Sequence, residues 1–232
     1  MGRQQRHDLD CSYFHPLTRS SSRHTLPMPG TGPDRDSRNT HRLTTERLWL
    51  EVPRDDDAPA LFHLAGGEDR AEIMAGLIWD GPDKVSDTRL FVEQSQTRSY
   101  GDFGFHWAIK DRTGAITGSP GRAMGMIGTR PSGELGRGDV GYWLGKTYWG
   151  RQIMAEALGS VLELCFGGLD MVKIEAEIFT TNARSIRLVE SVGMKLEGTI
   201  RSAHFKSGLW VDAHVYGILK HEWLAVGPAI SP

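Results

Sequence analysis

The stretch from residue 141 to residue 179 constrains the fold more than any other part of the chain, because it has the pattern of a strand, a helix and a second strand. A helix is predicted over residues 151–166, where apolar side chains recur at i,i+4 spacing in two neighbouring columns. The columns are Ile153, Ala157, Val161 and Cys165, and Met154, Leu158, Leu162 and Phe166. Charged and apolar residues then alternate over 172–179, as in a strand with unlike faces. The helix is therefore predicted to be a crossover connection that lies on one face of a sheet.

The rest of the chain adds strands and helices around this unit. Period-two alternation and turn residues predict strands over residues 48–52, 105–109, 124–128, 141–144, 196–205 and 210–219. Helices are predicted over residues 55–64 and 85–98, and from Asn182 to Gly193. The order β-α-α-β-β-β-α-β-α-β-β predicts an α/β fold of the mixed α+β kind, with a mixed sheet and helices on its faces.

The N-terminal part differs from the rest in composition. Residues 1–41 contain Arg, Ser, Pro, Gly, His and Asp without a hydrophobic period, so they cannot bury enough apolar surface to offset the cost of ordering. We predict a disordered extension over residues 1–41 and a single folded domain over residues 42–232. The 39% of hydrophobic residues in the chain are enough for a sizeable core.

Charge, hydropathy and cysteine content argue against several classes of function. The formal net charge of −2 gives no strong field that would attract nucleic acid or an anionic membrane, so neither is expected as a partner. No stretch approaches the roughly 18 consecutive apolar residues of a membrane span. Cys11 and Cys165 form no paired framework, so a cytoplasmic protein is expected, with Cys165 in the core. The histidines are scattered, so no metal site is expected.

The junction between the strand at 141–144 and the next helix has the composition of an anion site. The first amides of a helix have no partner within the helix and carry a partial positive charge. Gly150 lets a ligand approach the backbone closely, and Arg151 adds a full charge. Asn182 and Ser185 open another helix, whose N-terminus is expected at the same sheet edge. A phosphate or pyrophosphate ligand is predicted here, although Asn182 is also a common helix cap.

Several motifs in this order resemble those of the GNAT acyl-CoA N-acyltransferases, in particular the Rim-type ribosomal-protein N-terminal acetyltransferases. The resemblance covers about residues 42–224 and is closest from residue 127 onward. The matching stretches are Ile127–Gly128, Val140–Leu144, Tyr148–Leu158, Asn182–Met194 and Gly208–Asp212. Their order and spacing together are specific, although each motif alone is common.

This resemblance implies a GNAT fold, in which a mostly antiparallel mixed sheet is splayed at its centre and carries helices on both faces. It implies acetyl-CoA as co-substrate, with the pantetheine arm between the strands that end near Leu144 and Phe179. The backbone amides from Trp149 to Met154 would hold the pyrophosphate. The implied cofactor-binding residues are Tyr142, Trp143, Leu144, Trp149, Gly150, Arg151, Gln152, Ile153, Met154, Asn182 and Ser185.

One position departs from the family pattern. Gln152 stands where the family usually has a second glycine. Because glutamine is a good helix former, Gln152 is expected to belong to the first turn of the helix that begins at Arg151. We expect cofactor binding to survive the change, with a somewhat tighter loop.

Acetyl transfer to an amine needs a base for the amine proton, a donor for the oxyanion and a proton for the leaving thiolate. Asp139 lies at the start of the central strand, where many relatives carry a glutamate base. Glu175 and Glu177 project from one face of the neighbouring strand, a pattern that is also typical of a solvated face. Ser185 is expected to protonate the thiolate or to orient a water. The predicted catalytic residues are Asp139, Ser185 and Glu177, with direct attack by the amine in a ternary complex.

The residues alone do not identify the acceptor. A protein N-terminal amine and a small-molecule amine both suit the chemistry, and a homodimer is one assembly to consider. A second hypothesis is a non-catalytic acyl-CoA-binding module of the same fold, acting as a sensor or partner. A third is an unrelated phosphate-binding α/β protein. Acceptor choice is expected to depend on the first two helices and on the loop at residues 131–138.

Overall fold

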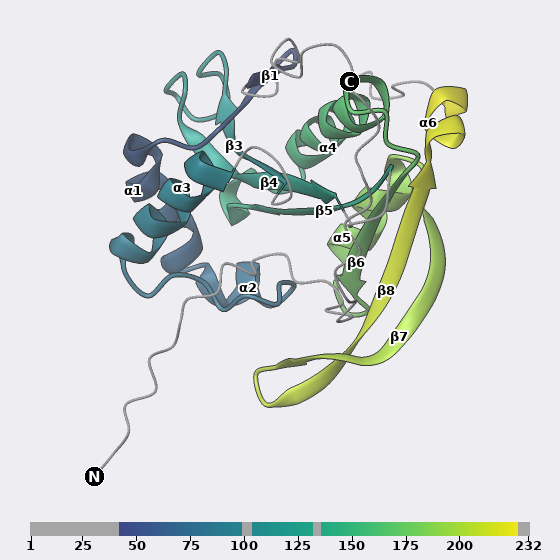
Figure 1. Ribbon diagram of the computed structural model, residues 1–232. Helices are drawn as coiled ribbons and strands as arrows, with labels where there is room; N and C mark the ends of the chain where they lie inside the picture. Colours follow the sequence, from purple (N-terminus) through teal and green to yellow (C-terminus); the bar gives the residue numbers. More distant parts are fainter. Residues whose placement is uncertain (1–41, 99–103, 132–135, 227–232) are drawn as a thin grey trace.

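The computed structural model describes residues 42–98, 104–131 and 136–226 (Figure 1). The predicted extension at residues 1–41 and residues 132–135 of the predicted loop lie outside the described residues. The strands are β1 (Arg42–Thr44), β2 (Leu48–Glu51), β3 (Phe105–Asp111), β4 (Ala123–Pro131), β5 (Arg137–Leu144), β6 (Lys173–Phe179), β7 (Lys195–Lys206) and β8 (Leu209–Leu219). The α-helices are α1 (Ala58–Gly66), α2 (Arg70–Met74), α3 (Val85–Arg98), α4 (Ile153–Glu163), α5 (Ala183–Ser191) and α6 (Lys220–Val226).

The strands form one eight-stranded sheet in the order β1-β2-β3-β4-β5-β6-β8-β7. Every neighbouring pair is antiparallel except β5 and β6, which are parallel and are connected by α4. Parallel neighbours need a crossover of a dozen or more residues, which is what the helical pattern predicted. The mixed, mostly antiparallel sheet is therefore confirmed.

The parallel pair separates soon after it forms. β5 and β6 pair over only three residues each, in the register Arg137–Lys173, Gly138–Ile174 and Asp139–Glu175. β5 then continues to Leu144 and β6 to Phe179 without further pairing to each other. The sheet is thus open at its centre, as the family resemblance implied.

Helices cover both faces of the sheet. Figure 1 shows α4 on one side of β3–β5 and α1 and α3 on the other, and α4 contacts β1, β2 and β4, whereas α1 packs on β4 and α3 on β3. The inward column of α4 is buried in the main core together with Trp107 and Ile127. Cys165 is buried there as predicted, and burial, opposed in part by Thr129, raises the pKa of its thiol to about 12.

Several boundaries differ from the prediction. The helix predicted from Arg151 begins at Ile153, and its α-helical part ends at Glu163, after which a π-helical turn runs from Leu164 to Gly168. β1 and α2 were not predicted, because elements of three and five residues are too short to show a period. α6 was also missed, since it follows β8 directly, without a turn residue between them.

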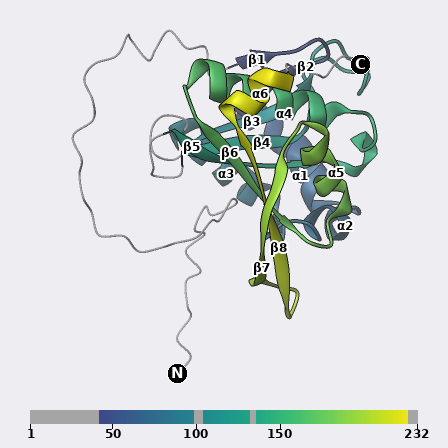
Figure 2. The same cartoon turned by 90° about the vertical axis from the view of Figure 1, so that its right-hand side faces the viewer.

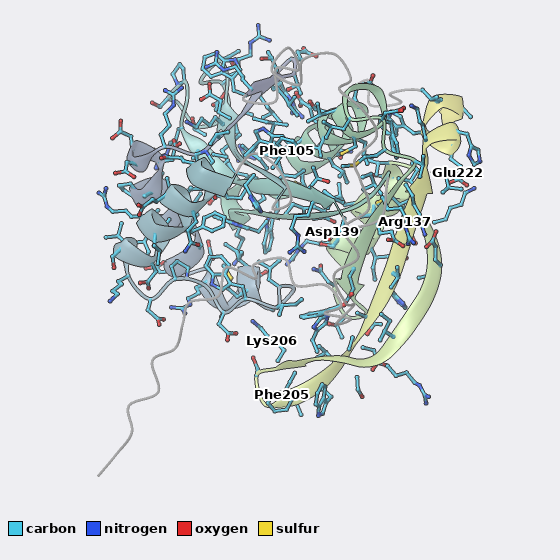
Figure 3. The ribbon with its side chains drawn as sticks, in the orientation of Figure 1. Phe105, Arg137, Asp139, Phe205, Lys206 and Glu222 are labelled. Carbon is cyan, nitrogen blue, oxygen red and sulfur yellow. The ribbon has the colours of Figure 1, made fainter. Side chains whose placement is uncertain are left out.

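β7 and β8 form a long hairpin, which extends well beyond the other strands (Figure 2). Lys206 near its turn donates to the carbonyl of Trp79 (2.8 Å) and pairs with Asp80, so the hairpin is tied to the segment between α2 and α3. Figure 3 shows Lys206 close to the body of the molecule and Phe205 at the far end of the hairpin. In the described residues, no helix is both long and apolar enough to span a bilayer.

We expect Leu158→Ala to lower the free energy of unfolding by about 2–5 kcal/mol, because Leu158 is completely buried between α4 and the sheet and its loss leaves a cavity. Leu224→Ala on the exposed face of α6 is the matched control and should change it by less than about 0.5 kcal/mol. Urea denaturation measures both. Equal effects would mean that α4 does not anchor the core.

Candidate active site

A groove of about 760 Å³ runs along the N-terminal ends of α4 and α5, beside the separated part of β5. This volume is typical of a small-molecule or cofactor site. It is lined by every residue predicted to bind the cofactor, namely Tyr142, Trp143, Leu144, Trp149, Gly150, Arg151, Gln152, Ile153, Met154, Asn182 and Ser185. The groove therefore brings together residues that lie up to about 40 positions apart in the sequence.

The start of α4 presents backbone amides to this groove. The first helical hydrogen bond runs from the amide of Glu156 to the carbonyl of Gln152 (3.1 Å), so the amides of Ile153 and Met154 precede the helical hydrogen bonds. Gly150 has a φ of +73°, and a Cβ added to it would meet open space. The turn thus leaves bare backbone facing the groove, which is the geometry that the predicted anion site requires.

The amide of Trp149 is not part of this cradle, which corrects the predicted range of Trp149 to Met154. It donates to the carbonyl of Lys146 (3.0 Å) in a short 3₁₀ turn, and the indole N–H donates to the carbonyl of Leu144 (2.8 Å). The ring instead lies under the guanidinium of Arg184, whose central carbon is 3.6 Å from the ring centroid. Trp149 thereby holds a cation at the mouth of the groove.

Gln152 is not part of the first helical turn, contrary to the expectation from its helix propensity. It is the N-cap residue of α4 and has left-handed backbone angles, φ 59° and ψ 11°. A left-handed residue with a Cβ costs roughly 1–2 kcal/mol, and only glycine adopts this conformation freely. The usual glycine at this position therefore serves a backbone requirement of the turn, and this chain meets the same requirement with a strained glutamine.

The turn is supported from behind by Arg47 and Glu156. The Glu156 carboxylate accepts from the backbone amide of Arg47 (3.0 Å) and from its guanidinium (2.6 Å), and also from the hydroxyl of Thr45. The same guanidinium donates to the carbonyl of Arg151 (3.1 Å). These contacts fix the turn before α4 against the β1–β2 connection.

Asn182 and Ser185 lie where β6 leads into α5. Asn182 caps α5, because its side-chain oxygen accepts from the amide of Ser185 (3.2 Å). Its amide nitrogen reaches the carbonyl of Gly76 at 3.5 Å, and a Cβ on Gly76 would overlap this side chain. Asn182 is therefore a helix cap, the alternative that the sequence left open, and it also lines the groove.

The hydroxyl of Tyr142 is buried and has no hydrogen-bond partner among the described residues. Burial raises the pKa of Tyr142, and the nearby Ser185 side chain opposes the rise only in part. A buried donor without a partner usually has an unseen one, such as a ligand or water. Because its pKa is raised, the Tyr142 hydroxyl stays protonated, and it lies on the part of β5 that no longer pairs with β6.

A second cavity, of about 110 Å³, lies in the gap between β5 and β6. Tyr142, Asn182 and Ser185 line both this cavity and the groove, so the two spaces meet there. All three predicted catalytic residues, Asp139, Glu177 and Ser185, line the second cavity. The structure therefore gathers the predicted catalytic residues at one end of the groove.

Asp139 lies at the end of the paired part of the two strands (Figure 3). Two nitrogens of Arg130 contact its carboxylate at 3.3–3.4 Å. Burial raises the pKa of Asp139, the Arg130 charge opposes the rise, and the nearby carboxylates of Glu175 and Glu177 add to it. Glu175 itself is paired with Arg137 (3.0 Å) and Lys173 (2.9 Å). Of the two glutamates of β6, Glu177 lines the cavity and Glu175 does not.

Glu177 is hydrogen-bonded to the Nε2 atom of His204, a residue that the sequence did not single out. His204 comes from β7, lines the same cavity and lies against the ring of Phe179. Its position depends on a bulge, because the register of β7 against β8 shifts between Ile200 and His204. Such bulges re-aim side chains next to active sites.

Asp212 holds the bulge in place. Its carboxylate accepts from the amide of Ser202 (2.7 Å), which has a φ of 49°. The motif at Gly208–Asp212 therefore contains the residue that holds the bulge, and the bulge positions His204. This link is visible only in the register shift of the structure. In the part of the chain that the structure describes, no group of His, Cys, Asp or Glu side chains could hold a metal ion.

We expect Gln152→Gly to raise the free energy of unfolding by about 0.5–1 kcal/mol. Glycine removes the strain of the left-handed conformation, and this gain exceeds the cost of the greater backbone entropy of glycine in the unfolded chain. Gln152→Ala is the control, since alanine loses the side chain and keeps the strain. Thermal melting of the two variants and the parent protein measures the difference. A glycine variant that melts at a lower temperature than the alanine variant would contradict the claim that residue 152 is strained.

Comparison with known proteins agrees with this geometry. A family model described as an acetyltransferase (GNAT) domain matches residues 47–195. The chain is 32% identical over 187 residues to the N-acetyltransferase p20 of Bacillus licheniformis. The aligned region covers 78% of this chain and 97% of that protein.

Two solved structures share the fold at lower identity. The ribosomal-protein-S5-alanine acetyltransferase of Vibrio fischeri has a TM-score of 0.65 at 16% identity and covers 78% of this chain and 98% of that one. The microcin C7 self-immunity acetyltransferase MccE, solved with acetyl-CoA and AMP, has a TM-score of 0.66 at 20% identity, with 75% and 93% coverage. The parallel pair that opens at its centre, the groove at the start of α4 and the family match together place this chain in the GNAT family of N-acetyltransferases.

Proposed function

We propose that this enzyme transfers the acetyl group of acetyl-CoA to a primary amine, of a protein N-terminus or of a small molecule, by direct attack in a ternary complex. The observation that carries the proposal is the meeting of two spaces at the gap between β5 and β6. One space has an anion-binding turn, and the other has carboxylates and a histidine. A donor and an acceptor bound in the two spaces would meet beside Tyr142 and Ser185.

The residues of the groove fit acetyl-CoA. Its pyrophosphate would lie on the amides of Ile153 and Met154, where Gly150 leaves room and Arg151 supplies charge. Arg184, held over Trp149, would face a further phosphate. The pantetheine arm would lie along the unpaired edges of β5 and β6. When bound, acetyl-CoA supplies the activated acetyl group.

Tyr142 and Ser185 are proposed to serve the leaving side of the reaction. Because burial raises the pKa of Tyr142, its hydroxyl keeps its proton and can donate a hydrogen bond at neutral pH. A donor in a water-excluded site stabilises the oxyanion and the leaving thiolate more than it would in bulk water. Ser185, beside this hydroxyl, is proposed to relay a proton to the thiolate, receiving one from water as it gives up its own so that its hydroxyl is restored.

Glu177 and His204 are proposed to remove the proton from the amine. Their hydrogen bond fixes the imidazole at the cavity, an arrangement in which a carboxylate orients a histidine base. Asp139, whose carboxylate is fixed by Arg130, is proposed to hold the amine in place by accepting a hydrogen bond from it. Proton removal then yields the neutral amine that attacks the thioester.

The Rim-type branch is the finer part of the proposal. It rests on the motif order of the sequence, since the ribosomal acetyltransferase of Vibrio fischeri is similar in fold at only 16% identity. Within this branch, the acceptor would be the N-terminal amine of a protein. An acceptor panel of peptide N-termini, lysine peptides and polyamines tests this choice.

We expect His204→Gln and Glu177→Gln each to lower kcat for acetyl transfer by about 10²–10⁴-fold, because each removes part of the proposed base. CoA release in the presence of an amine gives kcat, and calorimetry gives acetyl-CoA affinity, which should stay nearly unchanged. His214→Gln is the matched control on the same hairpin, since His214 bonds Thr199 (2.8 Å) and does not line the cavity. Acetyl-CoA binding without CoA release from any amine would favour the non-catalytic module.

We expect kcat/KM to rise from pH 6 to pH 9, because the acceptor amine must lose its proton and an α-amine titrates near pH 8. The ionised form of Asp139 is the active one, so its contribution is present above its raised pKa and is lost as pH falls through it. Asp139→Asn should therefore lower kcat/KM and remove a limb at the acidic end of the profile. An acidic limb that persists unchanged in this variant would assign it to another group.

A further inference from the structure

Residues 76–80, which follow α2 and are called the wall segment, form one side of both spaces at the gap. Gly76 and Leu77 line the groove and the second cavity, and Ile78 lines the second cavity. In the described structure the wall segment belongs to no helix or strand. Its position therefore depends on contacts with its neighbours rather than on a ladder of backbone hydrogen bonds.

The first part of the wall segment is held by packing. Leu77 and Trp79 pack against the buried cluster that contains Ile73 and Met74 of α2. Gly76 lies directly against the side chain of Asn182, with which a Cβ at this position would overlap. Packing thus fixes the end of the wall segment that is nearer to the cofactor groove.

The far end of the wall segment is held by one ammonium group, that of Lys206 in β7. Its Nζ atom donates to the carbonyls of Trp79 (2.8 Å) and Ile78 (3.4 Å) and to the carboxylate of Asp80 (2.5 Å). The side chain of Lys206 is only 9% exposed, whereas that of Asp80 is 81% exposed. An ammonium has three donors, so this half-enclosed group is fully satisfied by the wall segment.

The same face of β7 carries the histidine of the second cavity. His204 and Lys206 are two residues apart and pair regularly with β8, so their side chains point to one face of the hairpin. His204 reaches Glu177 from this face, and Lys206 reaches the wall segment (Figure 3). The Lys206 contacts therefore join two walls of the cavity, one with His204 and the other with Ile78.

We propose that Lys206 is a positioning residue for the acceptor amine. By holding the wall segment against β7, it keeps Ile78 and His204 at a fixed separation, so an amine that packs against Ile78 lies within reach of the base. The two carbonyls carry this role more than Asp80, because an exposed ion pair contributes little. The inference rests on the proposed acetyl transfer and adds a residue that acts through the walls of the acceptor cavity.

The test measures kcat and KM of the full chain with acetyl-CoA and three amines, glycinamide, Nα-acetyl-lysinamide and spermidine. For each amine that the parent protein acetylates, we expect Lys206→Met to raise the KM of the amine by about 10-fold or more. The kcat and the KM for acetyl-CoA should change by less than about 3-fold, because the base and the groove keep their own contacts. A fall in kcat with an unchanged KM for the amine would overturn the proposal.

Two variants separate this role from a general effect of lost charge. Lys195→Met is the matched control on the same strand, since Lys195 pairs with Glu222 (2.5 Å) and lines neither space. Asp80→Asn keeps both carbonyl contacts, so it should change the KM of the amine by less than about 3-fold. A rise in either variant equal to that of Lys206→Met would overturn the proposal and leave acetyl transfer intact. CoA release by the parent protein with none of the three amines would overturn acetyl transfer, and the inference with it.

A measurement on the unaltered protein covers the case in which Lys206→Met does not fold. CoA carries no acetyl group, so CoA and the best of the three amines bind together without reacting. At an amine concentration about ten times its Kd, we expect amide hydrogen exchange in residues 76–80 to be roughly 10-fold slower than with CoA alone. The β3–β4 turn at residues 112–122 lines neither space and should exchange equally in both. Exchange in residues 76–80 that the amine does not slow would overturn the proposal.

Discussion

The short pairing of β5 with β6 is the constraint on which the rest of the site depends. The two strands exchange hydrogen bonds only as far as Asp139 and Glu175 and then part. If they stayed paired, the gap that Tyr142, Asn182 and Ser185 line would not exist, and the groove and the second cavity would not meet there. β4 and β8 pair with the outer edges of the two strands along their length, so the strands stay in the sheet where they part from each other.

The same opening places helix termini at the site. α4 and α5 both begin where β5 and β6 have moved apart, so their first turns face the groove. The turn before α4 needs positive φ at Gly150 and at Gln152, and the Arg47–Glu156 contacts hold it from the other side. Backbone conformation, more than side-chain chemistry, thus shapes the turn at which the pyrophosphate is proposed to bind.

The sequence was sufficient for the elements that have a long period and for motifs that are contiguous. The columns of α4 and the alternation of β6 located the crossover, and all eleven predicted cofactor residues line one groove. It was insufficient where geometry depends on a single backbone torsion or on strand register. Helix propensity suggested a helical Gln152, whereas the turn requires a left-handed residue. His204 could not be found because only the β7 bulge, held by Asp212, aims it at Glu177.

The open centre leaves two backbone edges inside the sheet that face each other without a strand between them, at residues 140–144 and 176–179. Such edges are templates for any chain that offers alternating donors and acceptors. The two amide groups of a pantetheine arm have this character, so the bound cofactor would act as a surrogate strand and complete the hydrogen-bond ladder. The enzyme without cofactor is then an incomplete sheet, and its amide protons along this internal edge should exchange with solvent more readily than after the ladder is closed.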